Sequence, residues 1–308
     1  MPKKMNKNND NVKSYEEIYK EFNSQFSEEL LELLVYNEHM GYGTGFFQGI
    51  IEERRSNFLA CTDAASGRIM KELGILTLPV DKRNYRKNKK IRLKDNTIYR
   101  VRVRKRCLWK LYHNGKLITT IDSTSEKHRI NEYMLVDILD KKLRNEELET
   151  AAALAKEPVV IHTAEFGDFT MQRNGLYVEF SGQIAWLGEK CDVTLCPDTV
   201  NVPRTIDKSM EALKTLVSSM EEWDRKVKDF AADEMAEDDG MVYTWEGEEG
   251  ETPVSKDEFK RRLSLTDIYI EPSGDICFSY ELDEMFTDHG LSVEGNISGK
   301  MDSVSLDG

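Results

Sequence analysis

One stretch of the sequence, YRVRVRKRCLWKLYHNGKLITTID at residues 99–122, constrains the fold more than any other. Its first part alternates two valines with three arginines, Val101 and Val103 with Arg100, Arg102 and Arg104. Alternation with a period of two is typical of a strand with one buried face. The apolar pattern then resumes, and Asn114-Gly115 is a strong signal for a two-residue turn, because both residues must adopt positive φ. This stretch therefore predicts a β-hairpin with a basic face.

Four arginines in this stretch form what we call the basic ribbon: Arg100, Arg102, Arg104 and Arg106. Strand residues two apart are separated by about 7 Å, similar to the interval between phosphates along one nucleic-acid strand. Arginine can also bind a phosphate through two parallel hydrogen bonds. Three interpretations stay open: a solvated hairpin face, a contact surface for an acidic protein, or a surface for nucleic acid.

The charge of the chain is divided unevenly between its halves. Residues 1–150 hold 29 Lys and Arg against 22 Asp and Glu, a net charge of +7. Residues 151–308 have a net charge of −20, and the two halves together give −13. A split of this kind indicates two domains that face different partners or face each other. If the basic ribbon met the acidic half of another copy, head-to-tail homo-oligomers would follow.

Apolar spacing predicts helices in the N-terminal half. Ser14-x-x-Glu17 is typical of a capping box, and apolar residues at helical spacing follow it as far as Leu34. Ser123-x-x-Glu126 precedes a second stripe of this kind, which runs to Leu139. We therefore expect a mostly helical part that ends in the basic hairpin and a helix.

The C-terminal half contains the same pattern of short strands and turns twice. Short strand patterns separated by turn signals occupy residues 169–198 and again 268–297, with a long helical pattern at 207–235 between them. Two antiparallel meanders that bracket helices predict an α+β fold. The expected organisation is a disordered tail at residues 1–13, a helical and basic-hairpin domain at 14–157, and an acidic α+β domain at 158–308.

Composition argues against several classes of protein. No apolar run approaches the roughly 20 residues of a membrane span, and the polar N-terminus does not resemble a secretory signal. The five cysteines are scattered, which fits free thiols in the cytoplasm. No metal-binding or catalytic spacing stands out, and His289 beside Asp288 fits an acidic surface turn, so we expect neither an enzyme nor a cofactor.

Residues 233–251, DEMAEDDGMVYTWEGEEGE, form an acidic stretch without a basic residue. Its candidate binding residues are two aromatics and three glutamates: Tyr243, Trp245, Glu246, Glu248 and Glu249. A solvated loop is the simpler interpretation. The alternative is a docking surface for a basic protein, with the aromatic rings as anchors.

Residues 164–308 contain a Phe-Gly-x-Phe start, a tryptophan in the first expected meander, another in the expected long helix, and a closing Phe-x-x-His-x-Leu-x-Val segment. The residues concerned are Phe166, Gly167, Phe169, Trp186, Trp223, Phe286, His289, Leu291 and Val293. With these features the C-terminal half resembles an uncharacterised bacterial family, domain of unknown function 2262. Asp288 stands where that family places a glycine. The resemblance implies a small acidic domain of the sort found among immunity and other inhibitory proteins, with these residues in structural roles.

These observations favour a non-catalytic protein-binding module, a stoichiometric inhibitor of the immunity or anti-defence type, from a bacterium or phage. The expected partner is another protein, such as a toxin or a defence nuclease, or a second copy of the chain. A nucleic-acid-binding protein that uses Arg100–Arg106 is the alternative, and an unrecognised enzyme comes third. We expect no contact with a membrane.

Overall fold

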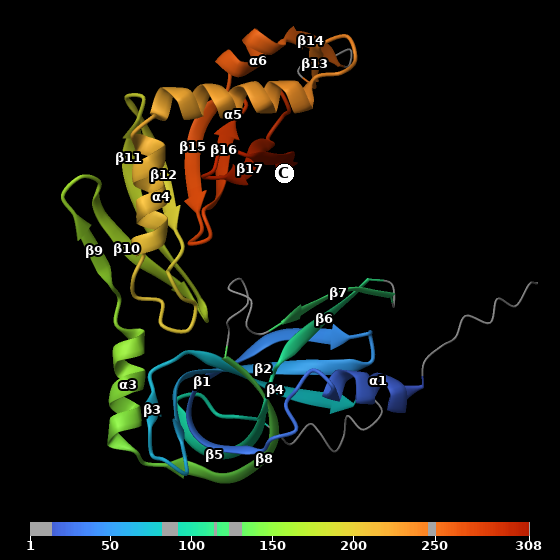
Figure 1. Cartoon of the computed structure of the whole chain (residues 1–308), viewed down its shortest axis with the longest axis vertical. Helices are drawn as coiled ribbons and strands as arrows, with labels where there is room; N and C mark the ends of the chain where they lie inside the picture. Colours follow the sequence, from blue (N-terminus) through green and yellow to red (C-terminus); the bar gives the residue numbers. More distant parts are fainter. Residues whose placement is uncertain (1–13, 82–91, 114–115, 123–130, 246–250, 308) are drawn as a thin grey trace, which may run out of the picture. The chain divides into compact units, whose positions relative to one another are not determined.

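A computed structural model of the chain describes residues 14–81, 92–113, 116–122, 131–245 and 251–307 (Figure 1). The tail at residues 1–13 lies outside this range. The chain divides into two compact units, Met1–Glu157 and Pro158–Gly308, which we call the N-terminal and C-terminal units and describe separately.

Strands dominate both units, so the expected α+β fold with a helical N-terminal part is wrong. Five strands of the N-terminal unit form one closed sheet: β1 (Leu31–Phe47), β2 (Ile51–Asp63), β4 (Gly74–Asp81), β5 (Thr97–Lys105) and β8 (Asn131–Leu143). They pair in the order β1-β5-β8-β4-β2, and β2 pairs with β1 again. The short β3 (Ile69–Met70) pairs with β2. All of these pairs are antiparallel except β4 with β8, and this Greek-key connectivity is that of the OB-fold.

The first expected helix is shorter than its apolar pattern suggested. α1 (Tyr15–Asn23) begins at Ser14 with the capping box, and Ile18 and Phe22 are buried. The helix ends at Asn23, and the chain then enters β1, where Leu33 and Val35 are buried. Strand pairing with β2 and β5 satisfies the backbone here and overrides a local helical pattern.

The second expected helix is also wrong where it can be assessed. Ser123–Glu126 lies outside the described residues, and Asn131–Leu143 is strand β8. Four successive residues of β8, from Glu132 to Leu135, are buried. Because this strand is covered on both faces at its start, it lacks the alternation that identifies a half-buried strand.

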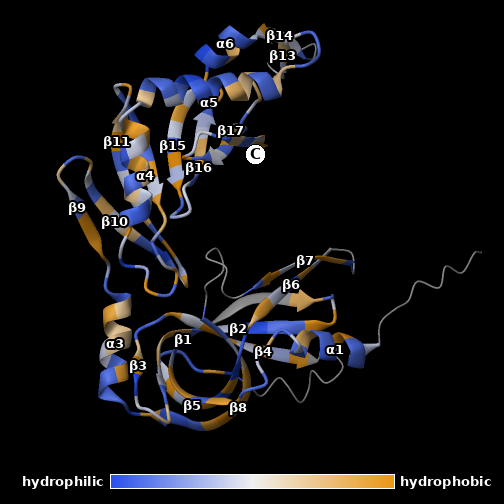
Figure 2. Cartoon of the chain, viewed as in Figure 1, coloured by the Kyte–Doolittle hydropathy of each residue, from blue (hydrophilic) through white to orange (hydrophobic). Residues whose placement is uncertain are grey.

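The predicted hairpin follows β5. β6 (Leu108–His113) and β7 (Lys116–Asp122) pair antiparallel and form a separate two-stranded sheet. The turn residues Asn114-Gly115 lie outside the described range. Leu117 and Ile118 are exposed on β7, and Figure 2 shows hydrophobic residues along part of this strand. α3 (Glu146–Lys156) ends the unit and packs through Leu148 and Ala151 onto the closed sheet.

The C-terminal unit is built on one eight-stranded sheet. Its strands are β9 (Val160–Thr163), β10 (Gly167–Asn174), β11 (Tyr177–Trp186), β12 (Glu189–Leu195), β15 (Ser264–Ile270), β16 (Asp275–Glu281), β17 (Gly290–Asn296) and β18 (Met301–Asp307). They lie in the order β18-β17-β16-β15-β12-β11-β10-β9. The sheet consists of two antiparallel meanders that are joined by a parallel pair, β12 with β15.

The segment between the two meanders covers one face of this sheet (Figure 1). It contains α4 (Asp207–Val217), α5 (Met220–Met235), the hairpin of β13 (Met241–Thr244) with β14 (Thr252–Ser255), and α6 (Lys256–Arg261). Leu213 and Leu216 of α4, with Val227 of α5, are fully buried against the inward side chains of the strands. Across both units, no helix within the described ranges is both long enough and apolar enough to cross a membrane.

Candidate functional site

The exposed end of the basic ribbon is neutralised by carboxylates on both neighbouring strands. Arg100 donates to Glu32 of β1 at 2.8 Å and lies 3.8 Å from Asp140 of β8. Arg102 donates to the other oxygen of Glu32 at 3.3 Å and to Asp137 at 3.4 Å. The hydrogen bond from Arg100 lowers the pKa of Glu32. Two guanidinium groups thus share one face with three acids.

Arg104 lies on the same face of β5 as Arg100 and Arg102, but it does not bind carboxylates in the same way. Its guanidinium donates to the carbonyl oxygens of Ser27 and Phe26, at 2.5 and 3.1 Å, and to the Asn23 side chain at 3.2 Å. Asn23 is the last residue of α1, and Phe26 and Ser27 lie between this helix and β1. Arg104 therefore fixes the segment that joins α1 to β1.

Arg106 is not on the surface, since only 4% of it is exposed. Its guanidinium donates to Glu53 of β2 at 2.8 Å and lies 3.2 Å from Glu132 of β8. It stacks 4.6 Å from the centre of the Phe26 ring. Glu132 also accepts from the indole of Trp109 at 3.1 Å. We call Arg106, Glu53, Glu132 and Trp109 the buried ion cluster.

The structure therefore divides the predicted ribbon into three environments. Arg100 and Arg102 remain accessible beside acids, Arg104 holds backbone, and Arg106 is enclosed. Sequence reasoning missed the partners Glu32, Glu53 and Glu132, which come from distant strands. The Leu31-Glu32-Leu33 alternation was a usable signal for the first of them.

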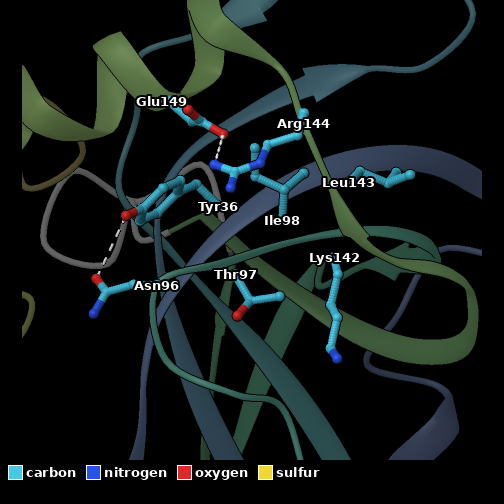
Figure 3. A pocket seen from close by; sticks show the side chains of 8 residues that line it. All are labelled: Tyr36, Asn96, Thr97, Ile98, Lys142, Leu143, Arg144 and Glu149. Atoms are coloured by element: carbon cyan, nitrogen blue, oxygen red, sulfur yellow. Dashed lines mark hydrogen bonds and ion pairs between the residues drawn. The ribbon is translucent and has the colours of Figure 1, made fainter.

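A cavity of about 360 Å³ lies in the N-terminal unit between α3, the middle of β1, the start of β5 and the end of β8 (Figure 3). It is lined by Tyr36, Asn96, Thr97, Ile98, Lys142, Leu143, Arg144 and Glu149. Ile98 is buried and belongs to the apolar cluster under α3. Burial raises the pKa of Tyr36, which stays a neutral hydrogen-bonding group. Sequence reasoning did not identify this cavity.

In the C-terminal unit, the structure brings the acidic stretch together with the closing His segment. Trp245 directly follows β13, and its backbone N–H donates to Met285 at 2.7 Å. Its ring contacts those of Phe286 and His289 edge-on, at centroid distances of 5.3 and 5.4 Å. Nevertheless, 44% of Trp245 is exposed. We call Trp245, Phe286 and His289 the Trp245 seat.

Tyr243 lies near this seat but is already engaged. Its hydroxyl donates to Asp239 at 2.7 Å, and this bond raises the pKa of Tyr243 and lowers that of Asp239. Asp288 is almost fully exposed beside His289. The predicted contacts Glu246, Glu248 and Glu249 lie outside the described residues. One predicted aromatic is thus available as an anchor, and it has carboxylates nearby.

The turn that carries Phe286 has an unusual backbone. Asp283, Glu284 and Thr287 all have positive φ, between 45° and 61°. Non-glycine residues rarely adopt this conformation, and it persists only where the surroundings impose it. Arg262 contributes to this by donating to the Asp283 side chain at 3.0 Å and to its carbonyl oxygen at 2.6 Å.

Most of the residues that carry the family resemblance lie in the core. Trp186 and Trp223 contact the same ring, that of Phe278, which sequence reasoning missed. Phe169 is fully buried, and its ring leaves no room for a side chain at Gly182, where a Cβ atom would lie 2.7 Å away. Phe166 packs at the edge of the core, and Gly167 starts β10 with φ of 77°. Phe286 is 2% exposed.

The sheet face opposite the helices carries two carboxylates side by side. Asp192 of β12 is directly opposite Asp267 of β15 in the parallel register. Burial, followed by the charge of Asp192, raises the pKa of Asp267 to about 6. Within the described ranges, no group of three or more His, Cys, Asp or Glu side chains is arranged to hold a metal ion.

Two families match the chain, one for each unit. Residues 163–306 match the family described as "Uncharacterized protein conserved in bacteria (DUF2262)". The resemblance of the C-terminal half is confirmed. Residues 19–154, which sequence reasoning had not assigned, match a "Domain of unknown function (DUF7021)". No curated protein matches the chain.

Proposed function

We propose that this protein is a non-catalytic, cytoplasmic protein-binding module whose contact surface is the Trp245 seat with its surrounding carboxylates. The carrying observation is that Trp245 stays 44% exposed although two rings and a backbone hydrogen bond fix its position. Large exposed aromatic groups with fixed orientation are the typical anchors of protein interfaces. A pre-ordered anchor also loses little side-chain entropy on binding.

The charge around the anchor indicates the kind of partner. Three exposed acids lie close to residues of the seat in the sequence: Asp239, Glu251 and Asp288. Residues 151–308 as a whole also carry a large negative charge. Such a field would speed association with a basic protein and discriminate against acidic ones. A stoichiometric inhibitor of a basic toxin or nuclease, of the immunity or anti-defence type, fits this description.

The strained turn supports the same surface. Three residues held in the left-handed region cost free energy, and such costs tend to persist where the position of a nearby group matters. The residue that this turn positions for the anchor is Phe286, against which the Trp245 ring packs. A solvated loop without a partner would gain from relaxing this backbone.

The test is quantitative capture of partners from nuclease-treated bacterial lysate by the intact chain, by Trp245→Ala and by a control, Tyr177→Ala. Tyr177 is a comparably exposed aromatic in the same unit, on β11. We expect one stoichiometric basic protein, released by salt, that wild type and Tyr177→Ala retain and Trp245→Ala loses by more than tenfold, since anchor residues contribute about 2 kcal/mol or more. Equal capture by both variants, with both folded by circular dichroism, would refute this surface.

One observation favours the second candidate, nucleic-acid binding: the closed sheet has OB-fold connectivity, and such folds often bind oligonucleotides across their second and third strands. Here those strands are β2 and β4, and Glu53 of β2 belongs to the buried ion cluster. Arg100 and Arg102 remain the accessible cations of the ribbon. Fluorescence anisotropy with labelled single-stranded DNA tests this: binding should weaken steeply with salt and with the Arg100→Ser, Arg102→Ser double variant. No binding at about 50 mM salt would remove this candidate.

A further inference from the structure

Two exposed carboxylates flank the Trp245 seat. The carboxylate of Asp288 lies 3.6 Å from Nδ1 of His289, whose ring contacts the Trp245 ring at a centroid distance of 5.4 Å. Glu251 directly precedes β14 and Trp245 directly follows β13, so the two residues occupy opposite positions at the open end of this antiparallel pair. One carboxylate therefore belongs to the turn that contacts the indole, and the other lies across the hairpin from it.

Among the described residues, Asp288 and Glu251 form no ion pair with a lysine or an arginine. Exposed acids of α6 differ in this respect. Asp257 lies 3.0 Å from Lys260, although 93% of its side chain is exposed. Asp288 is equally accessible, with 96% of its side chain exposed. Exposure alone therefore does not account for the missing cation at the seat, and both carboxylates are available to a cation from outside the described chain.

The aromatic part of the seat suits a flat cation. Trp245 keeps 44% of its surface exposed, while the rings of Phe286 and His289 contact its ring at interplanar angles of 78° and 88°. The face of an indole ring carries partial negative charge and attracts cations. A guanidinium group can lie flat on this face and still donate hydrogen bonds in its own plane to carboxylates. An ammonium group is a point charge that holds its water more tightly, so it gains less at a half-exposed site.

We propose that the Trp245 seat binds an arginine side chain of the partner protein. The guanidinium lies on the exposed indole, and the carboxylates of Asp288 and Glu251 accept hydrogen bonds from its N–H groups. This inference rests on the proposed function, and it narrows the partner from a basic protein to one that presents an arginine at the centre of its contact surface. The two carboxylates also discriminate against partners with an acidic residue at that position, because like charges would then meet.

The experiment uses the intact chain and the blocked peptides acetyl-Gly-X-Gly-amide, in which X is arginine, lysine or citrulline, the uncharged analogue of arginine. Binding is followed by the NMR shift of the Trp245 indole N–H, at constant ionic strength kept with sodium chloride. Trp245→Phe identifies this signal among those of the 4 tryptophans. We expect a saturable shift with the arginine peptide and no saturation with citrulline. The lysine peptide should bind about threefold more weakly, a difference of the size of cation–π contacts at exposed sites.

Two variants test the two parts of the site. Asp288→Asn removes the charge but keeps an oxygen that can accept from the Thr287 hydroxyl, as Asp288 does at 3.2 Å. It should weaken binding of the arginine peptide about threefold, as expected for the loss of an exposed ion pair. Trp245→Leu keeps an apolar side chain without the aromatic ring, and binding is then followed at the backbone amides of residues 286–289. This variant should lose the preference for arginine over lysine.

The matched control is Asp257→Asn, which makes the same change of charge at an equally exposed position that has Lys260 as its partner. It should bind the arginine peptide like wild type. A control that weakens binding as much as Asp288→Asn would mean that only general charge attraction is measured, and the arginine site would be refuted. Equal binding of the arginine and citrulline peptides would refute it as well.

The peptide titration and the capture from lysate fail independently. If a protein is captured through Trp245 but no peptide shifts the indole signal, the arginine site is refuted and the proposed function stands. If the arginine peptide binds as expected but capture does not depend on Trp245, the proposed function is refuted and the arginine site stands.

Discussion

The two units place carboxylates next to each other in opposite ways. In the N-terminal unit, Glu53 and Glu132 meet around the guanidinium of Arg106, which is fully enclosed. In the C-terminal unit, Asp192 and Asp267 lie opposite each other on parallel strands, and burial, followed by the charge of Asp192, raises the pKa of Asp267. Two buried carboxylates need a cation to compensate their charges. Two carboxylates at a partly exposed surface can instead reduce their repulsion when one of them takes up a proton.

Removal of the enclosed cation should have the largest effect. Arg106→Met keeps much of the side-chain volume but leaves Glu53 and Glu132 buried without Arg106, so the free energy of unfolding should fall by about 3–5 kcal/mol. Urea unfolding followed by circular dichroism measures this. Arg55→Met is the control, because Arg55 lies 3.8 Å from Glu53 at the surface, with 44% of its side chain exposed. A similar small loss in both variants would mean that the enclosed cation is not needed.

Removal of the paired acid should have a smaller effect of opposite sign. The folded-state pKa of Asp267, about 6, is above the ordinary value of 3.8. The protonated form therefore stabilises the fold fully below about pH 4, and this contribution is lost as the pH rises through 6. Asp267→Asn should raise the free energy of unfolding by about 1–2 kcal/mol at pH 8 and leave it nearly unchanged at pH 4.

Thermal unfolding of wild type and Asp267→Asn from pH 4 to pH 8 measures the difference. Its growth between pH 4 and pH 7 is the diagnostic feature. A difference that did not vary with pH would show that Asp267 does not titrate in this range.

The smallest effect on stability is expected at the exposed end of the basic ribbon, which holds Arg100 and Arg102. Arg102→Ser removes one of the two guanidinium groups beside Glu32, but Arg100 remains and water replaces the lost contact. The melting temperature should change little, and any change should shrink as salt is added. Because the arginines lower the pKa of Glu32, their contribution is present above its unfolded pKa and is lost as the pH falls. A loss comparable to that of Arg106→Met would contradict the distinction between the two ends of the ribbon.

The contrast between Arg102 and Arg106 shows what the sequence could tell. The alternation of residues 99–105 predicted strand β5 because one face of that strand is buried and the other is wet. Nothing local separates Arg106 from Arg102, because burial of Arg106 depends on Glu53, Glu132 and Phe26, which come from three distant segments. The capping box at Ser14 was also readable, since its bonds form within one helical turn.

Strand β8 shows why the fold class was missed. Tyr133, Met134 and Leu135 are all buried because the closed sheet and its covering elements enclose both faces. A buried strand of this kind has no period of two, so its apolar residues fitted a helical pattern equally well. Of the candidate sites, Trp245 was identified from its acidic surroundings, whereas the cavity beside α3 depends on which segments meet and has no sequence signal.

The parallel pair of β12 and β15 has a consequence for how the chain is made. The two strands are separated by the whole segment of α4, α5, β13, β14 and α6, so their pairing must close a long loop. Closing such loops costs entropy and slows folding. During synthesis, the β12 edge of the first meander stays unpaired until residues 264–270, which form β15, have left the ribosome. Synthesis at about 5–20 residues per second therefore leaves an incomplete sheet exposed to solvent for several seconds.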